Sequence, residues 1–176
     1  MTLILKALLF LLLFIGKECL ERRYFTQEPP EKIPGTTTCT DGWLPFEGSC
    51  YMFGQTAFDF TEAENFCRQN NSHLIHVESS GENEFIKDHL KQLQLRNWWI
   101  GMSDELIEGT WIWFDTKEYV HFSDWYPGQD QTTTEDCAIF WLPLAFKWAD
   151  YSCLGNFYPI CERRGTVCGA QLELVG

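Results

Sequence analysis

Oxygen-bearing side chains crowd into the stretch SDWYPGQDQTTTEDC, which covers residues 123–137. Its carboxylates, glutamines and threonines follow neither a helix period nor a strand period, so it is expected to be a loop. A second acidic stretch, SDELIEG, covers residues 103–109. Because calcium prefers oxygen ligands, both stretches are candidate metal-binding loops. The alternative is that acidic loops on an acidic protein simply face water.

The charge balance limits the partners of the protein. The chain has 176 residues and a formal net charge of −12. Such a protein is not an electrostatic partner for nucleic acid or for anionic membranes, and neutral glycans, basic proteins and calcium suit it better. The sequence contains no His-Glu-x-x-His, no Gly-x-Ser-x-Gly and no phosphate-cradling glycine loop, so we expect no enzymatic activity.

The N-terminal residues have the pattern of a secretory signal. An apolar run extends from Ala7 to Ile15, far short of the roughly 20 residues that span a membrane. We therefore expect a signal peptide within residues 1–19, cleaved after Gly16 or after Cys19, and a secreted, extracellular protein with no membrane insertion. A polar linker over residues 20–38, one domain over 39–164 and a tail over 165–176 are expected to follow.

Two helices are predicted from capping boxes. Thr61 to Glu64 is expected to begin the first helix, which ends at the Asn70-Asn71 pair and has Cys67 on its buried face. Ser79 to Glu82 is expected to begin the second helix, which continues to about Gln94.

Short aromatic strands are predicted around the helices. A hairpin is expected in CTDGWLPFEGSCYMF, before the first helix. After the second helix, the expected strands are WWIGM, TWIWF, CAIFWL, FKWAD and FYPICE. The predicted fold class is α+β, with two helices packed on short antiparallel strands.

The segment after the first helix carries two chemical patterns. Asn70-Asn71-Ser72 is an N-glycosylation acceptor, which predicts a glycan on Asn70 in a helix-ending turn. His73 and His76 flank a strand-like Leu-Ile pair. At a spacing of three in a strand they would point to opposite faces, so we expect them to be poor joint zinc ligands.

Several spaced motifs resemble one known family. Over roughly residues 39–164 the chain resembles the C-type lectin-like domain. The motifs that carry this resemblance, in order, are Trp99-Ile100-Gly101, Trp111-Ile112-Trp113, Glu135-Asp136-Cys137, Trp148-Ala149-Asp150 and Cys161-Glu162. The resemblance implies a C-type lectin-like fold with a long ligand-binding loop region.

The chain has eight cysteines, and export makes a disulfide framework the expected state. If the signal is cleaved after Cys19, Cys168 has no partner, which predicts an interchain disulfide and a homodimer. A Cys19 to Cys168 bond and a free thiol are the alternatives. The resemblance implies three pairs, namely Cys39 with Cys50, Cys67 with Cys161, and Cys137 with Cys153.

The resemblance also implies ligand sites in the long loop region. The implied auxiliary calcium site consists of Asp104, Glu108 and Asp136, with Asp130 nearby. The implied principal site, where calcium and sugar hydroxyls share ligands, consists of Gln129, Asp130, Gln131, Glu135 and Asp150. In this second set only Glu135 and Asp150 match carboxylate ligands of the family.

Two departures weaken the principal site. Asp130 replaces a proline whose cis bond aims the neighbouring side chains, and without proline the trans bond is favoured by about 2.5 to 4 kcal/mol. Ala149 replaces an asparagine ligand. We therefore expect calcium at the auxiliary site in preference to the principal one.

The expected function is carbohydrate binding by a secreted lectin, assisted by calcium and serving pathogen recognition. The alternative is a calcium-independent module that binds protein, matrix or mineral.

Overall fold

A computed structural model describes residues 36–93, 96–129 and 134–167. One compact unit comprises residues 37–166. The second unit comprises residues 1–36 and 167–176, of which only Thr36 and Val167 are described. The expected signal peptide, most of the linker and most of the tail therefore lie outside the described residues, as do Cys19 and Cys168. No helix in the described part of the chain is long and apolar enough to cross a membrane.

The predicted α+β fold class is confirmed, and the mostly antiparallel main sheet also contains one parallel pairing. Among the strands that the structure describes, only β5 and β9 pair in parallel. The short strands β4 (His73–Leu74) and β6 (Ile112–Trp113) pair with β9 and β5, respectively. β1 (Thr37–Thr38) and β10 (Thr166–Val167) form a separate two-stranded sheet. Both strands lie just outside residues 39–164, the expected limits of the domain. The order along the main path is β2 (Leu44–Phe46), β3 (Ser49–Phe53), β9 (Tyr158–Arg164), β5 (Trp98–Ser103), β7 (Cys137–Trp141) and β8 (Lys147–Tyr151).

The first helix, α2 (Phe60–Gln69), begins earlier than predicted. Its N-cap is Asp59, whose carboxylate accepts a 2.8 Å hydrogen bond from the Glu62 backbone N–H. The prediction that Thr61 is the cap was wrong, because the Asp59 side chain caps the helix and Thr61 lies inside the first turn. The helix ends at Gln69 with Asn70 as its C-cap, in agreement with the predicted stop at the Asn70-Asn71 pair.

The second helix, α3 (Ser80–Leu90), begins where it was predicted. The Ser79 hydroxyl accepts a 3.2 Å hydrogen bond from the Glu82 backbone N–H. The helix ends at Leu90, before the predicted Gln94. Gln92 and Leu93 donate to carbonyls three residues back, so the chain tightens into a turn there.

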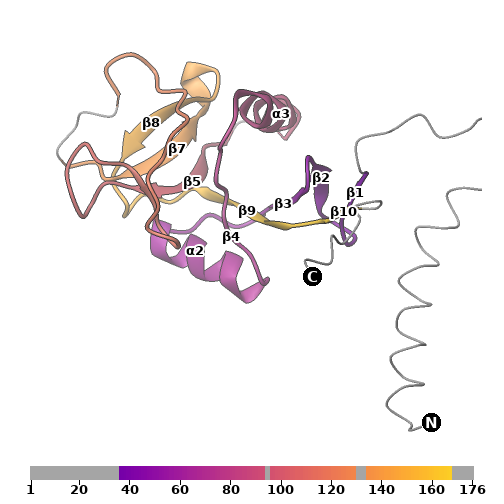
Figure 1. The fold of residues 1–176 in the computed structure, drawn as a ribbon. Helices are drawn as coiled ribbons and strands as arrows, with labels where there is room; N and C mark the ends of the chain where they lie inside the picture. Colours follow the sequence, from indigo (N-terminus) through magenta and orange to yellow (C-terminus); the bar gives the residue numbers. More distant parts are fainter. Residues whose placement is uncertain (1–35, 94–95, 130–133, 168–176) are drawn as a thin grey trace, which may run out of the picture. The chain divides into compact units, whose positions relative to one another are not determined.

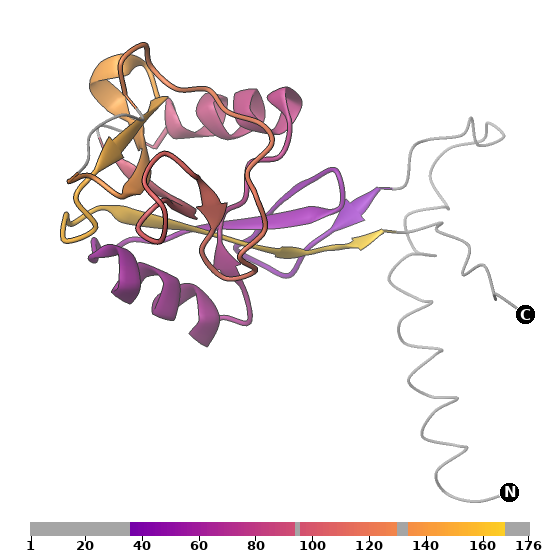
Figure 2. The ribbon, with the colours of Figure 1, turned by 60° about the vertical axis from the view of Figure 1, so that its left-hand side comes forward.

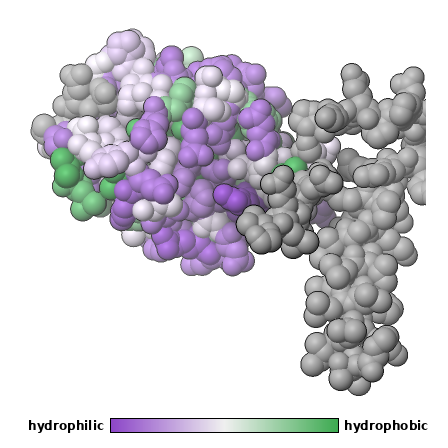
Figure 3. Space-filling model, viewed as in Figure 1, coloured by the Kyte–Doolittle hydropathy of each residue, from purple (hydrophilic) through white to green (hydrophobic). Residues whose placement is uncertain are grey.

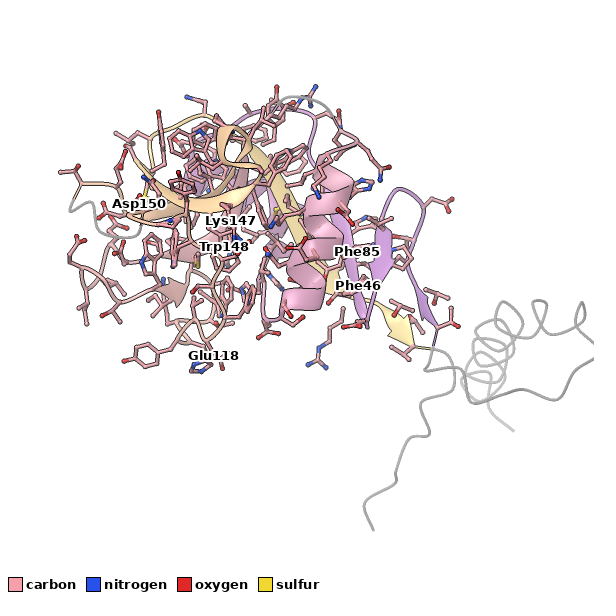
Figure 4. All side chains as sticks on the ribbon, turned by 90° about the horizontal axis from the view of Figure 1, so that it is seen from above. Phe46, Phe85, Glu118, Lys147, Trp148 and Asp150 are labelled. Carbon is pink, nitrogen blue, oxygen red and sulfur yellow. A yellow bond between two sulfur atoms is a disulfide. The ribbon has the colours of Figure 1, made fainter. Side chains whose placement is uncertain are left out.

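The two helices cover opposite faces of the sheet (Figures 1 and 2). Residues of β5 alternate between two cores: Trp98 packs on the α3 side and Trp99 on the α2 side. All six residues of β5 are buried, which is expected of a central strand covered on both faces. At the edge of the α3 core, the rings of Phe46 and Phe85 stack with centroids 4.2 Å apart (Figure 4).

Three disulfides lie within the described residues, and they are the pairs that the family resemblance implied. Cys67 of α2 bonds Cys161 of β9 across 94 residues of sequence. The other two are shorter links, Cys39 with Cys50 and Cys137 with Cys153. The long link joins α2 to the strand at the centre of the sheet.

One carboxyl group is buried beneath the α3 cap. Glu82 accepts a 2.5 Å hydrogen bond from the Tyr51 hydroxyl and a 2.8 Å bond from the Glu78 backbone N–H. Burial raises the pKa of Glu82 to about 7, and the charges of Glu162 and Glu78 add to this effect. The two hydrogen bonds oppose the rise without cancelling it.

This group should make stability depend on pH. The pKa of Glu82 rises from 4.5 to about 7 on folding, so in that window the folded protein binds more protons than the unfolded chain. The free energy of unfolding should therefore fall by about 3 kcal/mol as the pH rises through the window. Glu82→Gln should remove this fall, because glutamine does not titrate.

Urea denaturation of both proteins at pH 4.5 and pH 7.5 measures the effect. All other titrating groups are common to the two proteins, so the difference between their free energies of unfolding isolates Glu82. From pH 4.5 to pH 7.5, the free energy of unfolding of the variant should rise by about 3 kcal/mol relative to that of wild type. An equal difference at both pH values would show that Glu82 titrates normally.

Candidate functional site

Three strand ends meet at one edge of the sheet and position the acidic residues. Ser103 at the end of β5 is in register with Cys137, the first residue of β7. Cys137 is in turn in register with Tyr151, the last residue of β8. The residues next to these ends, Asp104, Asp136 and Asp150, are therefore brought to a common edge, from which the long loops extend (Figures 1 and 2).

Asp104 is the most constrained of these acids. It is buried, its Oδ2 accepts a 2.8 Å hydrogen bond from the Gly109 backbone N–H, and its own N–H donates to the Asp136 carbonyl at 3.2 Å. In the described part of the chain its Oδ1 is buried without a hydrogen-bond partner. Burial and the charges of Asp136 and Asp150 raise the pKa of Asp104, against the bond from Gly109.

The same charges act on an exposed neighbour. Partial desolvation and the charges of Asp104, Asp136 and Asp150 raise the pKa of Glu108. We call these four residues, Asp104, Glu108, Asp136 and Asp150, the acidic edge cluster. Within the ranges that the structure describes, no lysine or arginine forms an ion pair with Asp104, Glu108 or Asp136. The carboxylates of the cluster repel one another, and a bound cation would reduce this repulsion.

Asp150 also lies near the auxiliary residues. The resemblance assigned Asp150 to the principal sugar site, with Glu135, and that assignment stays a prediction. In the structure the charge of Asp150 contributes to the raised pKa of both Asp104 and Glu108, so it acts on the auxiliary residues as well. Asp150 lies on β8, beyond Trp148 and Lys147 on that strand (Figure 4).

The expected principal site is only partly described. Asp130 and Gln131 lie outside the described residues. Gln129 is half-buried, and its backbone N–H donates to the Tyr126 carbonyl at 2.9 Å. Glu135 is half-buried two residues before β7, and Ala149 is fully buried in the α2-side core, where it offers no side-chain oxygen. All four residues of the acidic edge cluster are described, so it is the more completely described of the two implied calcium sites.

Asp124 belongs to the first acidic stretch, but it is an anchor and not a free ligand. Its carboxylate accepts hydrogen bonds from Lys147, from Lys87 at 3.0 Å and from Asn83 at 2.9 Å. Burial alone would raise the pKa of Asp124, but these hydrogen bonds lower it below its ordinary value. The Asp124 carbonyl also accepts from the Trp148 N–H at 3.0 Å, so the long loop is fastened to β8 and α3. No motif in the sequence distinguished this aspartate from the others.

A second cluster was missed because two histidines were expected to diverge. The rings of His73 and His76 lie with centroids 4.3 Å apart, and His76 Nε2 lies 2.7 Å from Asp115 Oδ1. The prediction of opposite faces was wrong, because β4 contains only His73 and Leu74 and strand alternation does not continue to His76. Burial would raise the pKa of Asp115, but His76 and the charge of His73 lower it to about 2.

Asn70 is the C-cap of α2, and its side-chain amide donates to the Phe66 carbonyl at 2.9 Å. A glycan on this amide nitrogen leaves one N–H, which is enough to keep that bond. Glycosylation of Asn70 stays a prediction.

The surface also carries exposed apolar residues. Most of the face in Figure 3 is hydrophilic, with a small hydrophobic patch on the side of the long loops. Between Asp104 and Glu108, the side chains of Leu106 and Ile107 are 70% and 63% exposed. Apolar contact area is therefore available beside the acidic edge cluster.

Known proteins share this sequence pattern. The model of the lectin C-type domain family matches residues 56–163. The human C-type lectin domain family 17, member A, is 40% identical over 129 residues, which are 72% of this chain and 32% of the relative. Mouse asialoglycoprotein receptor 1 is 34% identical over 136 residues, which are 73% of this chain and 45% of the receptor. The chain thus spans less than half the length of these curated relatives.

Solved structures share the fold. The carbohydrate-recognition domain of cow CD23, determined in the presence of a GlcNAc2Man3 oligosaccharide, matches with a TM-score of 0.65 and 31% identity, over 74% of this chain and 98% of that one. A calcium-independent type II antifreeze protein matches with a TM-score of 0.66 and 26% identity, over 74% of this chain and 97% of the antifreeze protein. The family match, the motifs and the fold agree, and the chain belongs to the C-type lectin-like domain family.

Proposed function

We propose that the protein binds carbohydrate through its long-loop face, with calcium held at the acidic edge cluster. The observation that carries the proposal is the gathering of four carboxylates whose charges raise the pKa of Asp104 and Glu108. Calcium takes six to eight oxygen ligands, so it would offset this repulsion and leave positions for sugar hydroxyls or water. The buried Oδ1 of Asp104 is a ready ligand atom.

Two relatives support the carbohydrate part of the proposal. The cow CD23 domain was solved in the presence of an oligosaccharide, and the asialoglycoprotein receptor is named for a glycoprotein ligand. Members of this family are generally carbohydrate-binding proteins without enzymatic activity. The role proposed here is recognition of a glycan or glycoprotein and not catalysis.

The exposed Leu106 and Ile107 suit such a ligand. They stand in the same loop as Asp104 and Glu108, so a ligand held through its hydroxyls at the metal could pack an apolar surface on them. Secretion, a role in pathogen recognition and a disulfide-linked dimer through Cys168 are further parts of the proposal.

A second candidate function follows from Ala149. This buried residue replaces a ligand of the principal site, and one structural neighbour is a calcium-independent antifreeze protein. In this candidate the long-loop face binds protein, matrix or mineral without calcium.

A glycan array separates the two candidates. Binding to immobilised glycans is measured in millimolar calcium and then in excess chelator. The first candidate predicts retention that the chelator abolishes, and the second predicts no calcium-dependent retention on any glycan.

A further inference from the structure

One atom from each of His73, His76 and Asp115 lies within 4.8 Å of the other two. The three residues are half-buried, and the His76 and Asp115 side chains are only 13% and 17% exposed. We propose that they form a binding site for a zinc ion, separate from the acidic edge cluster. This proposal is independent of the proposed carbohydrate function.

The hydrogen bond of His73 prepares it as a ligand. Its Nδ1 lies 2.8 Å from the Leu74 carbonyl oxygen. A carbonyl can only accept, so Nδ1 carries the proton and the lone pair is on Nε2. Ligand histidines usually donate their second ring N–H to a carbonyl or carboxylate in this way, which fixes the tautomer and the ring orientation.

His76 and Asp115 are hydrogen-bonded to each other through the two atoms that would bind the metal. His76 Nε2 lies 2.7 Å from Asp115 Oδ1, and the acidic Asp115 requires Nε2 to be the donor. When zinc binds, the Nε2 proton leaves to solvent and Nδ1 carries the remaining ring proton, which is taken up from solvent if the ring was neutral. Nε2 and the carboxylate then both bind the metal. Zinc bonds of about 2.0 to 2.2 Å in a tetrahedral site put ligand atoms roughly 3.3 Å apart, so the pair must open by about 0.6 Å.

The backbone that carries these residues is rigid. His73 is in register with Glu162 of β9, and the Ile75 N–H donates to the Ile160 carbonyl at 2.8 Å. Gly101 of β5 donates to the Ile75 carbonyl at 2.9 Å and accepts from the Phe114 N–H at 2.8 Å. Gly101 thus ties the histidine segment to the segment that carries Asp115.

A side chain at Gly101 would prevent this contact. An added Cβ would lie 2.5 Å from the Leu74 carbonyl oxygen, so the close approach of the two backbones requires glycine. The His76 ring also stacks on Trp113, with centroids 4.4 Å and planes 13° apart. The segments that carry the ligands are fastened to β5 and β9 by these backbone contacts, and the three ligand atoms already lie within 4.8 Å of one another, so a metal would need only side-chain adjustments.

The ligand types select the metal. Two imidazoles and one carboxylate suit zinc and neighbouring transition metals, whereas calcium takes oxygen ligands alone. His73 and Asp115 line an open surface depression, so solvent reaches the site and water can complete the four ligands. Arg68 also lines the depression, but its charge is paired with Glu64 at 2.7 Å.

Calorimetric titration with zinc chloride tests the proposal. The disulfide-intact protein is freed of metal with a chelator and kept in millimolar calcium, which competes for carboxylate-only sites. We expect one zinc ion per chain. His73→Gln and Asp115→Asn should each weaken binding at least about 10-fold, since even outer-shell partners of a metal ligand contribute 10- to 100-fold.

His121→Gln is the matched control, because His121 is an exposed histidine outside the cluster, and this variant should bind zinc like wild type. Near-UV circular dichroism checks that each variant is folded. The visible spectrum of bound cobalt gives a second readout, which should change in His73→Gln because one of the two nitrogen ligands is lost. Equal zinc affinity in wild type, His73→Gln and Asp115→Asn would overturn the proposal. Zinc binding that Asp104→Asn weakens and His73→Gln does not would assign the metal to the acidic edge cluster instead.

Discussion

Replacing both Cys67 and Cys161 by alanine is expected to lower the free energy of unfolding by about 4.7 kcal/mol. The bond closes 94 residues of sequence, so its loss releases the largest loop in the described part of the chain. Both cysteines are fully buried between α2 and β9. Alanine is small and apolar, so it adds no unsatisfied polar group to the α2-side core.

The pair Cys39 and Cys50 is the matched control. It closes only 11 residues, for which the same chain-entropy relation gives about 3 kcal/mol. Urea denaturation of wild type and the two double variants at neutral pH measures both losses. The long link should cost about 2 kcal/mol more than the short one. Equal losses, or a larger loss for Cys39 and Cys50, would show that loop length does not govern the contribution.

Asp104→Asn and Asp150→Asn are each expected to lower calcium affinity at least about 10-fold. Each substitution keeps the size of the side chain and removes one of the four negative charges of the acidic edge cluster. Calcium affinity depends on the charge count of its ligands, and both aspartates are buried and held by the strand ends. Titration calorimetry with calcium chloride gives the affinity directly.

Glu118→Gln serves as the control for general surface charge. Glu118 is an exposed acid that lies apart from Asp150 in Figure 4, and among the described residues its side chain has no ion pair. This variant should bind calcium like wild type. Equal weakening by Glu118→Gln and Asp104→Asn would mean that calcium responds to net charge and has no defined site. A fully retained affinity in Asp150→Asn would remove that residue from the cluster.

Local signals explain why much of the fold was predictable. The Ser79 cap and the Asn70 stop depend on contacts within a few residues, so the sequence alone reveals them. The aromatic strand segments are also short local patterns. The parallel pairing of β5 with β9 involves strands far apart in sequence, and no local signal predicts it.

The sites were less predictable, because they depend on register and on where strands end. Ser103 is in register with Cys137 and Cys137 with Tyr151, which brings Asp150 to Asp104. The sequence places these two aspartates 46 positions apart. The meeting of His73 and His76 likewise depends on β4 ending after two residues, which a strand period cannot predict.

We propose above that the long-loop face recognises carbohydrate in a calcium-dependent way. The most direct test is a glycan array probed with the disulfide-intact protein in millimolar calcium, in excess chelator, and again after calcium is restored. We expect retention on a defined set of glycans, loss of that retention in chelator and its recovery with calcium, and we expect Asp104→Asn to be retained only weakly in both calcium conditions. Absence of glycan binding in all three conditions, or binding that persists unchanged in chelator, would contradict it.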